Sequence, residues 1–302
     1  MKKKLIVIIG PTAAKKSKLA HIIAREMNGS VINGDAFQIY KEVTVGVNKP
    51  SKEELGEIDY YLIDEISYKD EWSIAHFQRK FNQYYDEIVN KKKIPILCGG
   101  SHLYTDCIVN GYDLTNDTNP YLDEIKEWTI QELYEYIQKY DHVSAQKIGP
   151  NNFKRLQRCV LILKSNNNQP KSVLEVEKNK PIYDCLIIMV NKERQVLYDK
   201  INKRFDEFFS DDKWVNEVQN LINQDINVIN SQAFKAIGYT EIAQALIHNT
   251  PIDTDKLKQK TRQLAKRQLT WCNNRFPEKI VFDFDQDNLE ELLKKVKDFY
   301  YD

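Results

Sequence analysis

The stretch LIVIIGPTAAKKSKLA, residues 5–20, predicts a strand, a tight loop and the start of a helix. Residues 5–10 form a continuous apolar, β-branched run, which is typical of a strand buried on both faces of a parallel sheet. Residues 16–28 carry apolar side chains at helical spacing, and Asn28-Gly29 ends the predicted helix. A strand followed by such a loop and a helix is typical of an α/β fold in which the N-terminus of the helix can bind an anion.

The loop itself, GPTAAKKS at residues 10–17, matches the phosphate-loop pattern GxxxxGK[ST] except at Lys15, where the pattern has glycine. In such a loop, backbone N–H groups point at an anion, the lysine adds positive charge, and the Ser/Thr hydroxyl binds Mg²⁺. Lys16 and Ser17 are in register for the last two roles. A left-handed backbone at Lys15 would cost ~1–2 kcal/mol, whereas a permitted conformation would add a second cation at no such cost. Taken alone, the motif leaves a phosphate site and a chance turn about equally favoured.

Short apolar runs continue along the first part of the chain. Residues 30–34, 59–66 and 93–100 are predicted strands, and residues 73–93 form an amphipathic helical pattern. Strands that alternate with helices indicate a parallel sheet. The expected fold class is therefore α/β, with a P-loop NTPase-like parallel sheet flanked by helices.

The pattern changes after about residue 114. Residues 114–150 are polar, aromatic and helical, and we interpret them as a small helical insertion. The catalytic core would then comprise residues 1–113 and 151–302. Its second part contains a predicted strand at 183–191 and predicted helices at 151–164, 192–209, 213–223, 239–248 and 254–275.

Composition sets the general class of protein. Lys plus Arg and Asp plus Glu are both 44, so a generally basic coat is excluded, although local basic patches are not. The five cysteines form no CxxC pair, which favours reduced thiols, and no His or Cys spacing predicts a zinc site. No apolar run is long enough to cross a membrane, and the N-terminal run is too short for a signal peptide. We expect a cytoplasmic monomer without a membrane partner.

Further segments follow the loop in order: NGDAFQIYKEVTVGVNKPS (33–51), YYLIDEIS (60–67), GGSHLY (99–104), AIGYTEI (236–242) and TRQLAKRQLTW (261–271). Together they resemble the tRNA dimethylallyltransferases, or tRNA isopentenyltransferases, from residue 5 to about residue 275. That family moves a dimethylallyl group from its diphosphate to N6 of the adenosine on the 3′ side of the anticodon. The resemblance implies dimethylallyl diphosphate and a tRNA anticodon stem-loop as partners, and Mg²⁺ as cofactor. It also implies that residues 114–150 are a shortened form of the family's helical insertion and contact tRNA.

The resemblance implies roles for the loop and for the residue after the strand at 30–34. Asp35 resembles the family's general base in the motif DSxQxY, and an aspartate at the carboxyl end of a parallel strand is well placed to take the proton that the amine loses. Without the surrounding GDAFQIY, a lone aspartate there would more often be a helix cap. The loop would hold the diphosphate through Gly10, Pro11, Thr12, Ala13, Ala14, Lys15, Lys16 and Ser17, with Ser17 as the metal ligand.

Other residues match the family's motifs individually, and the resemblance implies a role for each. Ser101 matches the threonine of the family's GGTGLY, and Arg204 resembles an arginine near the diphosphate, so both join Asp35 as predicted catalytic residues. The segment predicted to touch the target base is Asp35, Ala36, Phe37 and Gln38, together with Ser101. A second predicted tRNA-contacting segment, KRLQR, consists of Lys154, Arg155, Leu156, Gln157 and Arg158.

The predicted helix at 254–275 carries a basic stripe. Lys258, Arg262 and Lys266 recur every four residues, and Lys260 and Arg267 lie beside them. A charge run is usually a solvated face, but the resemblance favours contact with RNA phosphates. We predict that Arg262, Lys266 and Arg267 contact tRNA, while a loop base splays out into the pocket.

Departures from the family pattern concentrate near the diphosphate. Lys15 replaces glycine, His102 replaces the glycine that follows Thr in GGTGLY, and Ala36 replaces a serine, so these changes could reduce activity. Three alternatives stay open at this point. The chain could be a nucleotide kinase that uses ATP, a tRNA-binding relative that has lost catalysis, or an enzyme that prenylates free adenylate.

Overall fold

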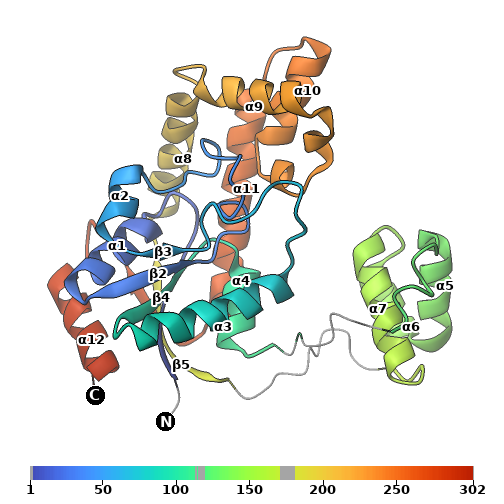
Figure 1. Cartoon of the computed structure of the whole chain (residues 1–302), viewed down its shortest axis with the longest axis horizontal. Helices are drawn as coiled ribbons and strands as arrows, with labels where there is room; N and C mark the ends of the chain where they lie inside the picture. The colour runs from blue at the N-terminus through green and yellow to red at the C-terminus, as the bar shows by residue number, and fades with distance from the viewer. Residues whose placement is uncertain (1–2, 113, 115–119, 171–180, 302) are drawn as a thin grey trace. The chain divides into compact units, whose positions relative to one another are not determined.

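Six parallel strands form one sheet in the order β3-β2-β4-β1-β5-β6 (Figure 1). The computed structural model describes residues 3–112, 114, 120–170 and 181–301. The strands are β1 Lys3–Ile9, β2 Gly29–Asn33, β3 Tyr60–Tyr61, β4 Ile94–Cys98, β5 Tyr183–Val190 and β6 Ile280–Phe282. Strands β2 and β4 are buried along their whole length because helices pack on both faces. The predicted α/β fold class is confirmed.

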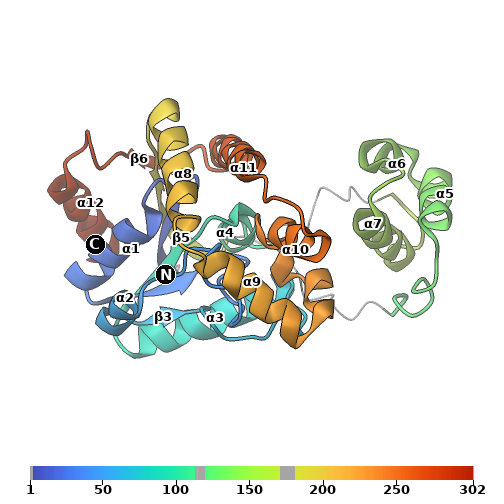
Figure 2. The ribbon, with the colours of Figure 1, turned by 90° about the horizontal axis from the view of Figure 1, so that it is seen from above.

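Helices α1 and α12 pack on one face of this sheet, and α3 and α4 pack on the other (Figure 2). The chain runs in one direction across the sheet from β1 to β2 and β3, and in the other direction from β3 to β4 and on to β5. Because the crossovers are right-handed, α1 lies on one face, and α3 and α4 lie on the other. The helices are α1 Lys16–Glu26, α2 Lys52–Glu57, α3 Ile74–Asn90, α4 His102–Val109, α5 Ile130–Tyr140, α6 His142–Ile148, α7 Phe153–Ser165, α8 Arg194–Phe208, α9 Lys213–Gln224, α10 Tyr239–His248, α11 Thr254–Arg275 and α12 Leu289–Tyr301, with short 3₁₀ turns at Ile226–Asn230 and Ala233–Lys235.

The chain divides into two units, Met1–Val109 with Ile182–Asp302, and Asn110–Pro181. The second unit is therefore longer than the predicted insertion at 114–150, and it includes α7, which the sequence analysis places in the core. The physical reason is packing, because Leu156 and Leu163 on α7 share a hydrophobic core with Leu133 and Ile137 on α5. Residues 115–119 of the predicted insertion lie outside the described residues.

Most predicted elements match the structure, and the clearest error is the strand predicted at 59–66. Only Tyr60–Tyr61 form a strand, because Leu62 and Asp64 adopt left-handed conformations with φ of 63° and 54° that turn the chain out of the sheet. The sequence analysis also missed α2, β6 and α12. The signal for α2 is a capping box in which Ser51 and Glu54 exchange side-chain-to-backbone hydrogen bonds.

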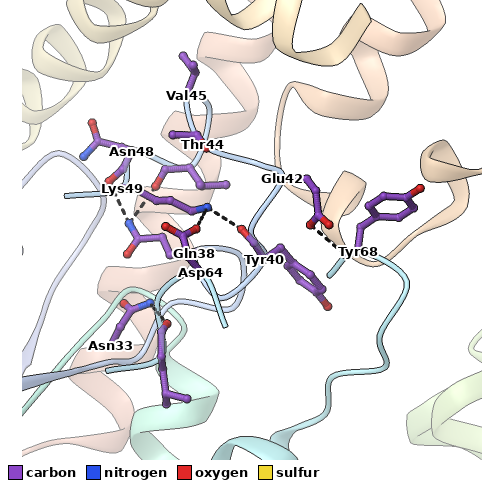
Figure 3. Close-up of polar contacts among 12 residues, drawn as sticks. Asn33, Gln38, Tyr40, Glu42, Thr44, Val45, Asn48, Lys49, Asp64 and Tyr68 are labelled. Atoms are coloured by element: carbon purple, nitrogen blue, oxygen red, sulfur yellow. Dashed lines mark hydrogen bonds and ion pairs between the residues drawn. The ribbon is translucent and has the colours of Figure 1, made fainter. Parts of the chain in front are cut away.

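The long connection between β2 and α3 contains the short elements α2 and β3, and polar contacts hold its irregular parts (Figure 3). Lys49, whose side chain is 3% exposed, donates to the carbonyl oxygen of Tyr40 at 2.6 Å and pairs with Asp64. Gln38 Nε2 donates to the carbonyl oxygens of Val47 and Asn48 at 3.0 and 2.9 Å. The turn that follows β2 is therefore fixed against the segment 47–49.

Helix α9 fixes the next part of the same connection. The carboxylate of Glu217 accepts from the N–H groups of Thr44 and Val45 at 3.1 and 3.2 Å, and from the Tyr239 hydroxyl at 2.6 Å. A methyl group on Gly46 would lie 2.3 Å from the Trp214 ring, so glycine alone fits there. Loop 44–48 thus lies firmly against the C-terminal helices.

We expect Lys49→Met to lower the free energy of unfolding by ~1–3 kcal/mol, because the buried Tyr40 carbonyl loses its donor and Asp64 loses its partner. Chemical denaturation monitored by circular dichroism measures the change. The matched control is Lys91→Met, which breaks an exposed ion pair with Glu87 and should shift the midpoint little. Equal shifts in the two variants would contradict a stabilising role for the buried lysine.

Candidate active site

The carboxyl ends of the central strands come together so closely that only glycine fits between them. A methyl group on Gly10, whose φ is 138°, would lie 2.1 Å from the carbonyl oxygen of Val190. One on Gly99 would lie 2.2 Å from the backbone of Gly34. Because parallel strands place their sites at this edge, the loops after β1, β2 and β4 converge there.

These loops and helices α8 and α11 enclose a cavity of about 520 Å³ within the first unit. Its cationic lining residues are Lys15, Lys16, Lys18, Lys200 and Arg204, and its acidic ones are Asp35, Glu54 and Glu207. Apolar side chains cover another part of the wall, namely Phe37, Val47, Phe205, Phe208, Ile237 and Leu264. The cavity therefore offers both a positive region for an anion and an apolar region for a hydrocarbon group.

The phosphate loop ends in a left-handed lysine. Lys15 has φ 72° and ψ 33° and directly precedes α1, so the strained alternative of the sequence analysis is the one observed, at a cost of ~1–2 kcal/mol. The first N–H groups of α1, those of Lys16, Ser17 and Lys18, have no acceptor among the described residues. They are therefore free to bind an anion at the positive end of the helix.

Lys16 and Asp35 converge on the same point of the cavity. A methyl group on Gly100 would lie 3.8 Å from Lys16 Nζ and 3.7 Å from Asp35 Oδ2. Lys16 Nζ also donates to the carbonyl oxygen of Pro11 at 2.8 Å. Burial lowers the pKa of Lys16, and its own charge lies close enough to act on Asp35.

Asp35 is poised to gain and lose a proton. Its Oδ1 accepts from the Phe37 N–H at 2.9 Å, and its backbone is held by Asn33 Oδ1 at 3.1 Å. Burial raises the pKa of the Asp35 carboxyl, while the Phe37 N–H and the charges of Lys16 and Arg204 oppose the rise. A carboxylate with a raised pKa at a cavity wall is a better base than an exposed one.

The other two predicted catalytic residues lie in different positions. Arg204 lines the cavity and donates from Nη2 to Thr12 Oγ1 at 2.9 Å, so α8 reaches the phosphate loop. Ser101 is not among the lining residues, and its Oγ accepts from the Ala36 N–H at 2.9 Å. Ser101 therefore holds the turn that carries Asp35.

Most of the predicted phosphate loop faces the cavity through Thr12, Ala13, Lys15, Lys16 and Ser17, whereas Gly10, Pro11 and Ala14 are not among the lining residues. Ala36 is not among them either, but Phe37 and Gln38 are. His102 also lies away from the wall, packed with its Nε2 3.5 Å from Cys272 Sγ on α11. Burial lowers the pKa of His102 to about 4, so it is neutral. The imidazole that His102 introduces in place of glycine therefore packs against α11 and does not fill the cavity.

The sequence analysis did not assign Gln268 to the site. Its Oε1 accepts from the Thr12 N–H at 2.8 Å, and its Nε2 donates to the carbonyl oxygen of Gly100 at 2.9 Å. The sequence signal was available, since Gln268 stands on the inward face of a helix and a buried amide requires partners. The pattern could not name those partners, because they come from distant loops.

The basic stripe on α11 is only partly free. Lys258 pairs with Asp206, Lys260 pairs with Glu241, and Arg262 donates to Asn202 at 2.6 Å. Lys266 and Arg267 are exposed, and neither has an ion pair among the described residues. These two side chains have no partner among the described residues, and Arg262 keeps its charge because its partner is a neutral amide.

The KRLQR segment lies at the start of α7 in the second unit. Lys154, Arg155 and Arg158 are exposed, and Gln157 is partly exposed. Leu156 is fully buried in the core of that unit, so its side chain anchors α7 rather than facing a partner.

Comparison with known proteins identifies the family. The family model described as IPP transferase matches residues 38–275. The tRNA dimethylallyltransferase of Malacoplasma penetrans is 42% identical, with 100% of this chain and 99% of the relative covered. A crystal structure of tRNA delta(2)-isopentenylpyrophosphate transferase from Staphylococcus epidermidis is 32% identical, covers 98% of each chain and gives a TM-score of 0.71.

A crystal structure of a eukaryotic dimethylallyltransferase acting on tRNA gives a TM-score of 0.85 at 25% identity, over 99% of this chain and 80% of that one. The match thus extends over the sheet, the phosphate loop and the C-terminal helices that enclose the cavity. This chain belongs to the IPP transferase family.

Proposed function

We propose that the chain transfers a dimethylallyl group from dimethylallyl diphosphate to N6 of the adenosine on the 3′ side of the anticodon in tRNA. The observation that carries the proposal is the convergence of Lys16 and Asp35 on Gly100, in a cavity with both cationic and apolar walls. A base and a diphosphate-binding cation then stand at one reacting centre. The names of the relatives support the same reaction.

The cationic region suits the leaving group. As the bond between the first carbon of the prenyl group and the diphosphate oxygen breaks, negative charge grows on the diphosphate. The free N–H groups at the start of α1, with Lys16 and Arg204, lie where they stabilise that charge. The apolar wall formed by Phe37, Ile237 and neighbouring side chains suits the hydrocarbon.

Asp35 acts on the other reactant. As the new bond between N6 and carbon forms, the nitrogen must lose one proton, and the Asp35 carboxylate accepts it. The hydrogen bonds of Asp35 to its own turn, and of Ser101 to Ala36, fix the direction of the carboxylate. Orientation of this kind lets proton transfer accompany nucleophilic attack.

The site also fits a magnesium ion. No group of three His, Cys, Asp or Glu side chains that could hold a metal occurs among the described residues. Mg²⁺ in such sites is bound through one or two protein ligands together with substrate phosphates and water. The exposed Ser17 hydroxyl, in the first turn of α1, is the protein ligand we assign, and the ion would add positive charge beside the diphosphate.

The tRNA is expected to meet three surfaces, in the cytoplasm and with the enzyme as a monomer. Phe37 and Gln38 line the cavity and would contact the splayed adenosine base. Lys266 and Arg267 on α11 would contact phosphates of the stem. The exposed cations of α7, Lys154, Arg155 and Arg158, supply a third set of phosphate contacts.

We expect Asp35→Asn to lower the rate of prenyl transfer by about 10²–10⁴-fold, because the amine loses its proton acceptor. Transfer of radiolabelled dimethylallyl to an unmodified tRNA measures the rate, and anisotropy of labelled tRNA measures binding, which should be retained. The matched control is Asp86→Asn, an exposed carboxylate paired with Lys3. Wild-type transfer by Asp35→Asn would rule out Asp35 as the base.

The pH dependence of kcat/KM gives a second test. Asp35 must be ionised to accept a proton, and burial raises its pKa, so the acid limb should lie at higher pH than an ordinary aspartate would give. Activity therefore rises with pH through the Asp35 pKa. An acid limb at or below the usual range of aspartate would show that another group sets the profile.

Removal of either free cation on α11 should weaken RNA binding and lessen its salt dependence. We expect Lys266→Gln and Arg267→Gln each to reduce the slope of log affinity against log salt by about 1 for the loss of one phosphate contact. Anisotropy of an anticodon stem-loop over a salt series measures the slope. Lys258→Gln is the control, since Lys258 is already paired with Asp206; an equal effect there would show that the stripe acts only through total charge.

A further inference from the structure

Lys15 has a strained backbone conformation, and its side chain makes no ion pair among the described residues, although its charge acts on Asp285. Its left-handed backbone, φ 72° and ψ 33°, is one that glycine adopts freely. The side chain is exposed at the cavity and has neither a hydrogen bond nor an ion pair among the described residues. Lys16, its neighbour, does have a partner in the Pro11 carbonyl oxygen. The Lys15 charge is therefore available to a ligand.

A second lysine approaches the same cavity from α8. Lys200 lines the cavity, is 32% exposed, and lies 3.8 Å from an oxygen of Asp285. Asp285 also pairs with the buried Lys192 and lies within the field of Lys15, so its single negative charge is shared among three lysines. Burial and the neighbouring Lys192 lower the pKa of Lys200, and the charge of Lys15 acts in the same direction. Lys200 thus lies in a positive field that an anion in the cavity would relieve.

We propose that Lys15 and Lys200 form a second pair of cations around the diphosphate and supply part of the charge neutralisation that Mg²⁺ would otherwise provide. The inference rests on the proposed function, because it assigns a ligand to the same cavity. All four cations line the cavity, but Lys16 and Arg204 also donate hydrogen bonds to Pro11 and Thr12 of the phosphate loop. In the described part of the chain, Lys15, directly before α1, and Lys200, on α8, make no hydrogen bond to that loop. Diphosphate binding in this chain should therefore depend less on Mg²⁺ than the bare loop pattern implies.

The left-handed conformation of Lys15 allows a second measurement, the melting temperature of a Lys15→Gly variant. Lys15→Gly restores a residue that accepts the left-handed backbone, so it should raise the melting temperature by roughly 2 °C. The same change removes a cation from the diphosphate and should weaken its binding. A lysine with a purely structural role would not combine a gain in stability with a loss of affinity.

The experiment is titration calorimetry of inorganic diphosphate against the whole chain, once with EDTA and once with Mg²⁺. The variants are Lys15→Gly and Lys200→Met. The control is Lys213→Met, which removes an exposed lysine of α9 whose partner is Asp211, with neither residue in the cavity lining. With EDTA, each test variant should bind diphosphate about tenfold more weakly than the parent, as expected for the loss of one charged contact. With Mg²⁺ the loss should be smaller, and the control should bind as the parent does.

The outcomes separate the inference from the proposed function. If the parent binds diphosphate only with Mg²⁺, or if both test variants bind as well as the parent with EDTA, the second cation pair is rejected while the phosphate loop stands. If the parent binds no diphosphate under either condition, the proposed function itself fails. A tenfold loss with EDTA in both variants, with a higher melting temperature for Lys15→Gly, supports the inference.

Discussion

The buried amide of Gln268 is the contact on which the site depends. One helix, α11, reaches the phosphate loop through the Thr12 N–H and the β4–α4 turn through the Gly100 carbonyl oxygen, at 2.8 and 2.9 Å. Both ends of a single amide are satisfied, so the two loops and the helix hold one fixed relation. That relation places Gly100, the point where Lys16 and Asp35 converge, at the cavity. The exposed basic side of α11, which we propose contacts RNA, is thereby joined to the cavity.

Electrostatic balance within the cavity follows from this arrangement. Burial raises the Asp35 pKa and lowers the Lys16 pKa, while each charge opposes the effect on the other. Both side chains are buried, so neither charge is fully solvated by water. In the reaction we propose, Asp35 would keep its proton affinity because the neighbouring cations stabilise it only in part. The same cations would remain available to the leaving diphosphate.

The phosphate loop and the connection after β2 both contain residues with strained, left-handed backbone conformations. The left-handed residues other than glycine are Ala13 and Lys15 in the loop, and Asn48, Leu62 and Asp64 in the connection. Asp64 is compensated by Lys49, and Leu62 by burial and by a hydrogen bond from its N–H to Glu65 at 2.7 Å. Lys15 has no such internal compensation, which is why its cost points to a ligand. Tertiary contacts decide which strained residues are structural and which are available for binding.

Local patterns were enough to predict β1, β2, β4 and β5, the phosphate loop and the place of Asp35, because β-branched runs, helical spacing and GDAFQIY are all short-range signals. They did not determine that Leu62 ends β3 early, or that α7 belongs to the second unit, since turns and packing partners depend on distant residues. Only the tertiary structure showed that Ser101 supports the Asp35 turn, that His102 turns toward Cys272, and that Lys258 is already paired. A pattern identifies which residues carry chemistry, but side-chain partners come from long-range contacts that no local spacing records.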